Sequence, residues 1–209
     1  LVDLLIHVPM DSITNGTIPA VGTTAHGFGG PQITEGKYGH ALSNNGTSTR
    51  TGIDLGPHQN DCLGNLSLCP DGATFSLWFK PIRVGVWNFM IRSTTIVLYS
   101  RSESLEFGML FSATFNDGTY AYNQYNLATV TFEEWHLVGI TYSQTYGFQV
   151  YMDGCYTHGG SRKLANATIH NFEIGCRQSG GSCARAHFDD LRFWTTRKSS
   201  TFMWQLWRM

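Results

Sequence analysis

Three short segments in the second half of the chain most constrain its fold. They are Trp135–Tyr142 (Trp-His-Leu-Val-Gly-Ile-Thr-Tyr), Val150–Gly154 (Val-Tyr-Met-Asp-Gly) and Phe188–Trp194 (Phe-Asp-Asp-Leu-Arg-Phe-Trp). Each is rich in the β-branched and aromatic residues typical of strands, and the second ends in an Asp-Gly turn. They predict packed β-strands, and none of them contains an obvious catalytic group.

The rest of the chain continues this pattern. Phe75, Leu77 and Phe79 alternate along a strong strand at Ala73–Lys80, so they share one face of it. Further strands are expected at Val2–Met10, Lys37–Leu42, Arg50–Leu55, Val84–Ile91, Thr95–Ser100, Leu105–Ala113, Phe148–Met152, Phe172–Cys176 and Ala186–Trp194. The sequence lacks the helical patterns that are expected between the strands of a parallel sheet. The sequence therefore predicts an all-β, two-sheet antiparallel sandwich that forms one domain over residues 1–209.

Composition agrees with strands joined by tight turns and excludes some partners. The chain has 23 glycines, and its charged share of 14% is low against a typical share of about 25%. A net charge of −1 without a basic stripe argues against nucleic acid as a partner. No apolar run reaches the roughly 18 residues of a membrane span.

The C-terminal segment breaks the strand pattern. Residues 199–209 predict a short helix that begins with a serine cap. Apolar residues surround most of this helix, so it needs a partner surface. We expect it to pack on the edge of the sandwich; the alternative is that it docks on a neighbouring subunit.

Cysteines and glycosylation sequons favour secretion. Sequons of the form Asn-X-Ser/Thr begin at Asn15, Asn45, Asn65 and Asn166.

The five cysteines are Cys62, Cys69, Cys155, Cys176 and Cys183. Cys62 and Cys69 are expected to close a small loop around Asn65. Cys155 with Cys176 is the first choice for a second disulfide, because each follows a glycine at the end of a strand, and Cys176 with Cys183 is the alternative. The remaining thiol is buried or joins another chain, and zinc is disfavoured because no Cys-x-x-Cys pair is present.

Taken together, these segments resemble a known family. Their order resembles the laminin-G-like and pentraxin-like branch of the concanavalin A-like lectin/glucanase superfamily. The matching segments are Leu5–Asp11, Gly36–Leu42 followed by Asn45-Gly46, Phe75–Lys80, Trp135–Val138, Val150–Gly154, Ile174-Gly175 and Phe188–Trp194. The resemblance implies a jelly roll of two curved antiparallel sheets. It says less about function, because the fold hosts lectins, adhesion modules, hormone carriers and glucanases.

Catalytic patterns are absent from the sequence. The Glu-x-Asp-x-x-Glu pattern of glucanases on this fold does not occur. Glu103 and Glu106 are three residues apart, so on a strand they point to opposite faces. Glu133 and Glu134 would likewise point to opposite faces of a strand. No Gly-x-Ser-x-Gly nucleophile elbow is present. The chain is therefore not expected to be an enzyme.

Two kinds of binding site are suggested instead. Many relatives bind calcium, and a single structural Ca²⁺ is expected to contact Asp11 at the end of the first strand and Asp189 in the closing strand. Asp153 is explained by its Asp-Gly turn. Tyr120 and Tyr122 share a strand face and could stack on a sugar, although a cross-strand pair in the sheet explains them equally.

These observations favour an extracellular, non-catalytic recognition or adhesion module that binds a glycan or a protein. The alternative is a self-assembling structural glycoprotein subunit of an extracellular fibre or matrix, because sparse charge and an apolar tail allow large faces to be buried between copies. A glycoside hydrolase is the least favoured function.

Overall fold

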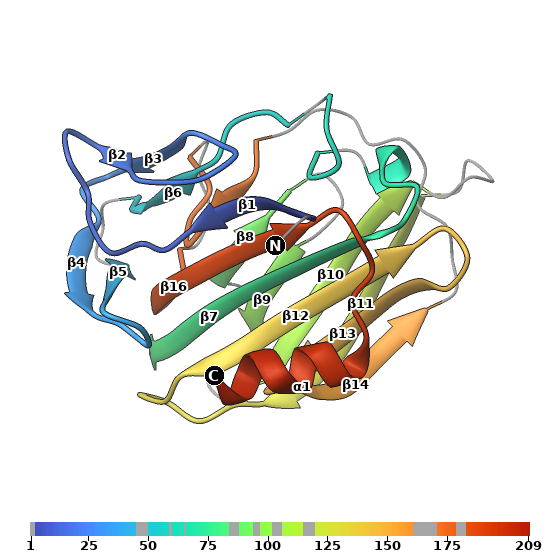
Figure 1. Ribbon diagram of the computed structural model, residues 1–209. Helices are drawn as coiled ribbons and strands as arrows, with labels where there is room; N and C mark the ends of the chain where they lie inside the picture. The colour runs from blue at the N-terminus through green and yellow to red at the C-terminus, as the bar shows by residue number, and fades with distance from the viewer. Residues whose placement is uncertain are drawn as a thin grey trace.

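Two antiparallel β-sheets face each other in the computed structural model of the chain (Figure 1). The structure describes residues 3–44, 50–58, 60–64, 66–83, 88–93, 97–101, 106–114, 120–160, 171–178 and 183–209. The paired strands run antiparallel within each sheet, for example β12 with β7 and β10 with β11. The predicted all-β sandwich with a short C-terminal helix is confirmed.

The first sheet has the strand order β14-β13-β12-β7-β16-β5-β4, and β1 also pairs with β16. Its strands are β1 (Leu4–Val8), β4 (Gln32–Glu35), β5 (His40–Asn44), β7 (Ala73–Arg83), β12 (His136–Ser143), β13 (Gly147–Met152), β14 (Cys155–Gly160) and β16 (Arg185–Trp194). The three segments that most constrain the sequence thus lie in one sheet.

The second sheet has the order β11-β10-β9-β8-β15-β6-β3-β2. Its strands are β2 (Thr17–Ile18), β3 (Ala25–Phe28), β6 (Gly52–Asp54), β8 (Asn88–Arg92), β9 (Val97–Arg101), β10 (Glu106–Thr114), β11 (Tyr120–Thr129) and β15 (Glu173–Ile174). A short 3₁₀ helix, η1 (Leu66–Leu68), precedes β7.

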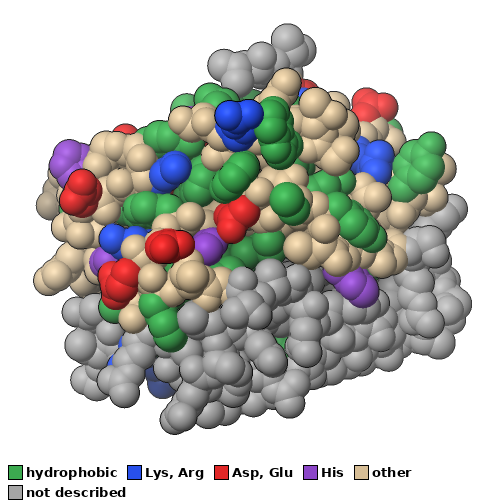
Figure 2. Space-filling model, turned by 90° about the horizontal axis from the view of Figure 1, so that it is seen from below, with side chains coloured by type: hydrophobic (Ala, Val, Ile, Leu, Met, Phe, Trp, Pro, Cys, Tyr) green, Lys and Arg blue, Asp and Glu red, His purple; other side chains and the backbone are tan. Residues whose placement is uncertain are grey.

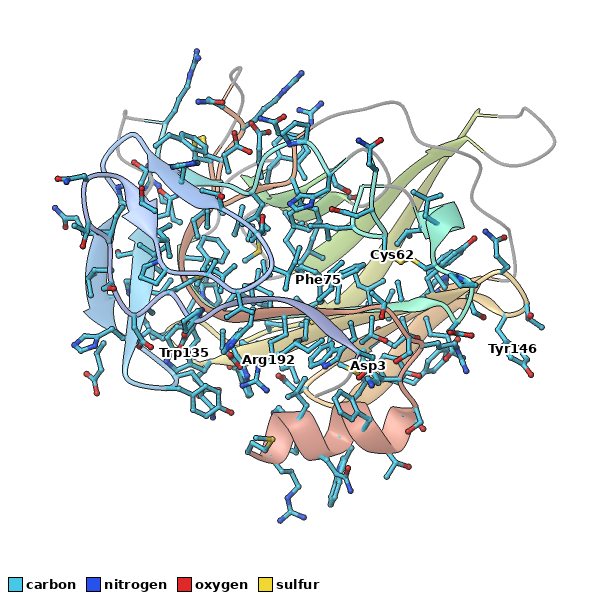
Figure 3. All side chains as sticks on the ribbon, turned by 45° about the horizontal axis from the view of Figure 1, so that its top comes forward. Asp3, Cys62, Phe75, Trp135, Tyr146 and Arg192 are labelled. Atoms are coloured by element: carbon cyan, nitrogen blue, oxygen red, sulfur yellow. A yellow bond between two sulfur atoms is a disulfide. The ribbon has the colours of Figure 1, made fainter. Side chains whose placement is uncertain are left out.

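Alternation along the strands divides the first sheet into two apolar faces. Phe75, Leu77 and Phe79 on β7 are buried in the core between the sheets, and Figure 3 places Phe75 inside the molecule. Burial of each such side chain contributes about 1.5–3 kcal/mol. Trp78, between them, belongs to a second apolar cluster, which lies on the outer face because neighbouring strand residues point to opposite sides.

Helix α1 (Ser200–Arg208) covers this outer cluster (Figure 1). Ser199 caps the helix, since its Oγ accepts a hydrogen bond from the Phe202 N–H at 3.2 Å. Met203 and Leu206 are buried against Trp78, Leu137, Tyr151 and Trp194. Gly139 on β12 leaves room for the Met203 methyl group, which would overlap a Cβ atom at that position. The tail packs on the sandwich as expected: it contacts the edge strand β14 and extends over the outer face of the first sheet.

A bulge in β16 opens one side of that strand. Residues 186–188 pair with β5 and residues 191–194 pair with β1, while the pairing with β7 is interrupted between Asp189 and Arg192. Asp190 adopts a φ of 47° there. Asp189 and Asp190 therefore lie where β16 changes its pairing from β5 to β1.

The structure contains the disulfides Cys62–Cys69 and Cys176–Cys183. The first is the pair expected from the sequence. The first-choice pairing of Cys155 with Cys176 is wrong, because Cys155 begins the edge strand β14 and is exposed, whereas Cys176 is buried beyond β15 in the other sheet. Among the residues described, no helix has the length and apolar character needed to cross a membrane.

Candidate functional site

The two predicted calcium ligands bind the same turn, which joins β4 to β5. Asp189 Oδ2 accepts a hydrogen bond from the Tyr38 N–H at 2.9 Å, and Asp11 Oδ1 accepts one from the His40 N–H at 2.9 Å. Asp189 is fully buried and Asp11 is exposed. Both carboxylates thus accept hydrogen bonds from backbone groups between Tyr38 and the start of β5.

The carboxylate of Asp189 is buried and only partly hydrogen-bonded. Burial raises the pKa of Asp189 to about 6; the hydrogen bond from Tyr38 opposes this rise, and the charge of Asp190 adds to it. Asp189 Oδ1 is buried without a hydrogen-bond partner, a costly state that a bound cation would relieve. Within the described ranges, no group of three or more His, Cys, Asp or Glu residues is placed to hold a metal. The Ca²⁺ site stays a prediction.

Asp190 is held by different partners from those of Asp189. Its Oδ1 atom lies 2.8 Å from His7 Nε2 and accepts a hydrogen bond from Arg192 Nε at 2.9 Å. Asp190 thus ties β16 to β1, and this pairing explains why a charged residue is tolerated in a nearly buried position.

Asp153 does more than form its predicted turn. Its Oδ1 accepts a hydrogen bond from the Leu137 N–H at 2.9 Å, and its Oδ2 lies 2.7 Å from His136 Nδ1. Burial alone lowers the pKa of His136, but the Asp153 carboxylate, the Thr131 carbonyl and Glu134 more than offset this effect, so the pKa is raised. A protonated His136 can donate from both ring nitrogens, to Asp153 and to the Thr131 carbonyl at 3.1 Å. The group therefore fastens the β13–β14 turn to β12.

The carboxylates considered for catalysis do not form an acid–base pair in the described part of the chain. Glu133 and Glu134 are exposed in the loop before β12, and Glu134 Oε2 accepts a hydrogen bond from Thr131 Oγ1 at 2.5 Å. Glu106 begins β10, but its side chain lies outside the described residues, as does all of Glu103. The described geometry thus offers no support for glycoside hydrolysis.

An open groove lies on the outer face of the first sheet, beside the start of α1. It encloses about 370 Å³, within the roughly 300–1,000 Å³ of small-ligand sites. Its lining residues are Gln149, Tyr151, Tyr156, Arg197, Ser199 and Ser200. Figure 2 shows the molecule from below, where hydrophobic side chains lie among acidic, basic and histidine side chains.

Strand alternation supplies one wall of the groove. Phe148, Val150 and Met152 of β13 are buried in the core between the sheets, so Gln149 and Tyr151 point to the outer face. Tyr156 on the edge strand β14 is the cross-strand partner of Tyr151, and their rings meet edge to face at 6.0 Å. Tyr151 is buried, but 56% of Tyr156 is exposed. The groove thus has an accessible aromatic ring supported by a buried one.

The segment between β16 and α1 supplies the opposite wall. The Arg197 N–H donates to the Asp71 carbonyl at 2.9 Å, and the Lys198 N–H donates to Thr74 Oγ1 at 2.8 Å. Lys198 Nζ is paired with Asp3, which Figure 3 places beside this segment. These bonds hold Arg197 in place at the groove while they neutralise the charge of its neighbour.

Polar contacts inside the groove converge on Gln149. Its Oε1 atom accepts hydrogen bonds from Arg197 Nη2 at 2.5 Å and from the Tyr151 hydroxyl at 3.0 Å. The Arg197 guanidinium also lies 4.9 Å from the ring centre of Tyr146, a residue at the tip of the β12–β13 turn (Figure 3). An aromatic surface beside fixed polar groups is the arrangement with which proteins bind small polar ligands.

Most other predicted sites lie outside the described residues. Asn45, Asn65 and Asn166 are among them. Asn15 is described: it is exposed in a hairpin turn with a φ of 48°, which asparagine tolerates. Tyr120 and Tyr122 lie in β11, but their side chains are outside the described part, so their stacking role stays a prediction.

Comparisons with known proteins add a family to this geometry. A family model described as the concanavalin A-like lectin/glucanases superfamily matches residues 55–201. No curated protein matches the sequence significantly. Solved structures, in contrast, match over almost the whole chain.

Three solved structures illustrate these matches. Domain 4 of AbnA, a GH43 extracellular arabinanase from Geobacillus stearothermophilus, in complex with arabinotriose, is 15% identical with a TM-score of 0.68, covering 98% of each chain. The binding domain of Paraclostridial Mosquitocidal Protein 1 is 12% identical with a TM-score of 0.75, and the match covers 99% of this chain and 52% of that one. Trypanosoma rangeli sialidase in complex with 2,3-difluorosialic acid is 13% identical with a TM-score of 0.75, and the match covers 99% of this chain and 33% of that one. The chain thus spans about half of the toxin domain and a third of the sialidase.

Proposed function

Because the chain belongs to the concanavalin A-like lectin/glucanase superfamily, we propose that it is a non-catalytic module that binds carbohydrate outside the cell. The groove between β13, β14 and the start of α1 is the proposed binding site. The observation that carries this proposal is the exposed Tyr156 ring beside the Gln149–Arg197 pair.

The groove has the features that a sugar requires. The flat, weakly polar face of a sugar ring packs against an aromatic ring, while its hydroxyl groups need donors and acceptors fixed around its edge. Tyr156 offers the ring, and Gln149, Arg197 and the serines at the start of α1 offer the polar groups. The openness of the groove suits one or two residues of a longer oligosaccharide, and the AbnA domain in complex with arabinotriose supports binding of an oligosaccharide on this fold.

An extracellular location is supported by the two disulfides. Disulfides form and persist in oxidising compartments and are rare in the cytosol. The exposed Asn15 sequon agrees with passage through a secretory route. Mass spectrometry of the secreted protein before and after glycosidase treatment checks this part of the proposal.

The proposed site is tested by oligosaccharide binding. The wild-type protein is applied to an array of neutral and acidic oligosaccharides, and each hit is measured by calorimetry. Tyr156→Ala is expected to weaken binding about tenfold or more, because aromatic contacts contribute about 0.5–1.5 kcal/mol beyond the area they bury. Phe132→Ala removes another exposed aromatic ring, in the loop before β12 and outside the groove, and is expected to leave binding unchanged.

Two results would contradict this proposal. Equal losses in both variants would mean that the groove is not the site. Silence on the array together with capture of a defined extracellular protein would favour a protein-binding module instead.

A second candidate function is self-association, favoured by the outer side of α1. Trp204, Trp207 and Met209 remain exposed there. The first two lie against the β13–β14 turn, since a Cβ at Gly154 would be 2.9 Å from Trp204 Cα and 3.2 Å from Trp207 Cβ. The exposed thiol of Cys155 follows that turn. A second copy packed here would cover this apolar surface.

Light scattering coupled to size-exclusion chromatography tests this candidate. Self-association predicts a concentration-dependent increase in mass that a Trp204→Ser, Trp207→Ser double variant removes. The Phe132→Ala variant serves as the matched control. A monomer at high concentration in both wild type and variant would exclude it.

A further inference from the structure

We propose that the groove selects acidic sugars, with Arg197 binding a carboxylate or sulfate group of the ligand. This inference rests on the proposed function and specifies the ligand class of the same site. It is carried by the charge and the hydrogen-bonding state of the lining residues.

Among the described residues, the lining carries one formal charge, and it is positive. Arg197 is the only ionised side chain among the six described residues that line the groove. Within the described part of the chain, no carboxylate lies within 4.0 Å of its guanidinium, and Arg197 Nε is buried without a hydrogen-bond partner. Two other described cations on this sheet already have acidic partners, since Lys198 pairs with Asp3 and Arg192 with Asp190. Among the described residues, the charge of Arg197 therefore has no carboxylate partner, and an anion in the groove would compensate it.

Gln149 shows that the groove is rich in donors. A guanidinium only donates hydrogen bonds, so the Gln149 atom facing Arg197 is its oxygen. That oxygen also accepts from the Tyr151 hydroxyl, which fills its two lone pairs. The Gln149 amide nitrogen is left as a donor. Ser199 Oγ likewise accepts from the Phe202 N–H, which leaves its hydroxyl proton to donate.

The start of α1 adds to the preference for an anion. Ser199 and Ser200 line the groove at the N-terminal end of the helix, where backbone N–H groups lack partners within the helix. No acidic residue lies in the first turn to compensate the helix dipole. The dipole thus has the same sign as Arg197 and reinforces its field.

The preference is tested with three tetrasaccharides of similar size: one neutral, one with uronic acid residues and one with sulfate groups. Wild type is expected to bind one or both acidic ligands about tenfold more tightly than the neutral one. The carboxylate and sulfate arms identify which anion fits. Increasing salt from low to high concentration is expected to weaken acidic binding severalfold and neutral binding little, because salt screens the charge of an open groove. This measurement needs no variant.

Variants then assign the charge to Arg197. Arg197→Gln is expected to abolish the preference while retaining neutral binding, and Arg197→Lys to retain part of it, since lysine keeps the charge without the planar fork. Lys198→Gln, at the neighbouring but paired cation, is the matched control and is expected to keep the preference. Circular dichroism and the Tm of each variant verify folding.

The outcomes separate this inference from the proposed function. Equal binding of neutral and acidic ligands by wild type, abolished by Tyr156→Ala, would overturn the acidic preference and retain the carbohydrate site. A preference that survives in Arg197→Gln would also overturn the inference. Absence of binding to all three ligands and to the array would overturn the proposed function and this inference together.

Discussion

The aspartates beside the β4–β5 turn and Arg197 beside β13 and β14 differ in the partners that their charges have. At the β4–β5 end, Asp189 and Asp11 accept hydrogen bonds from backbone groups of one turn, and Asp190 is paired with His7 and Arg192. At the β13–β14 end, Arg197 contacts a neutral amide and an aromatic ring instead of a carboxylate. The carboxylates are thus paired within the fold, whereas the guanidinium has no carboxylate partner among the described residues. Changes at the first kind of residue should alter stability, and changes at the second should alter binding.

Asp153 should give the largest effect on stability. Asp153→Ala leaves the Leu137 N–H and His136 without their acceptor and places alanine at a φ of 51°. We expect it to lower the free energy of unfolding by about 3–4 kcal/mol, measured by urea unfolding. Asp153→Asn is the control, because asparagine tolerates this φ and keeps one acceptor, so its loss should be clearly smaller. Equal losses in the two variants would show that the carboxylate charge beside His136, and not the turn conformation, accounts for the loss.

Asp189 should give the next largest effect, and it should depend on pH. Its folded-state pKa of about 6 lies above the ordinary 3.8, so the folded state binds the proton more tightly. Stability from this group is therefore greatest below about pH 4 and falls as the pH rises to about 6, by roughly 2–3 kcal/mol in total. Asp189→Asn keeps an acceptor for the Tyr38 N–H and should remove this slope. Parallel urea-derived stability profiles of wild type and variant between pH 4 and pH 7 would refute this account.

Calcium would challenge the comparison most directly, because it would make Asp189 a ligand-binding residue. If Asp189 Oδ1 binds Ca²⁺, EDTA should lower the Tm of wild type by a few degrees, since a ligand that binds only the folded state stabilises it. The same treatment should leave Asp189→Asn unchanged. An EDTA-independent Tm in both proteins would assign the aspartates solely to the fold.

Arg197 should give the smallest effect on stability. Arg197→Gln loses the bond to Gln149 but also removes a buried donor that has no partner, so the two effects nearly cancel. We expect a change in unfolding free energy of less than about 1 kcal/mol. A loss as large as that of Asp153→Ala would place Arg197 among the residues used by the fold.

The periodic part of the fold could be predicted from the sequence, and the irregular part could not. Strands with buried faces, such as β7 and β12, show period-2 alternation or continuous apolar runs, and both were identified. The edge strands β4 and β14 were missed. In β14, Tyr156 is exposed and Gly159 and Gly160 are adjacent, so no buried face imposes a pattern. The C-terminal helix could be predicted from its serine cap and apolar residues, but these local features do not indicate where on the sheet it packs.

The candidate site was missed for a related reason. Gln149 and Tyr151 could have been recognised, because they alternate with the core residues Phe148 and Val150 and therefore had to point outward. Tyr156 and Arg197 lie on an edge strand and in a connecting segment, and contacts distant in sequence bring them together. Sequence periodicity carries no information about such contacts. The aspartates were found because a charged pair inside an apolar strand is unusual in itself.

The pairing of β1 with β16 also makes the groove depend on the slowest kind of contact in the fold. The backbone bond from Thr195 to Asp3 and the ion pair of Lys198 with Asp3 join residues more than 190 positions apart. Contacts of such long range slow folding, since the loop between them must close first. Arg197 follows β16 directly. The groove should therefore form only after this long-range pairing is made.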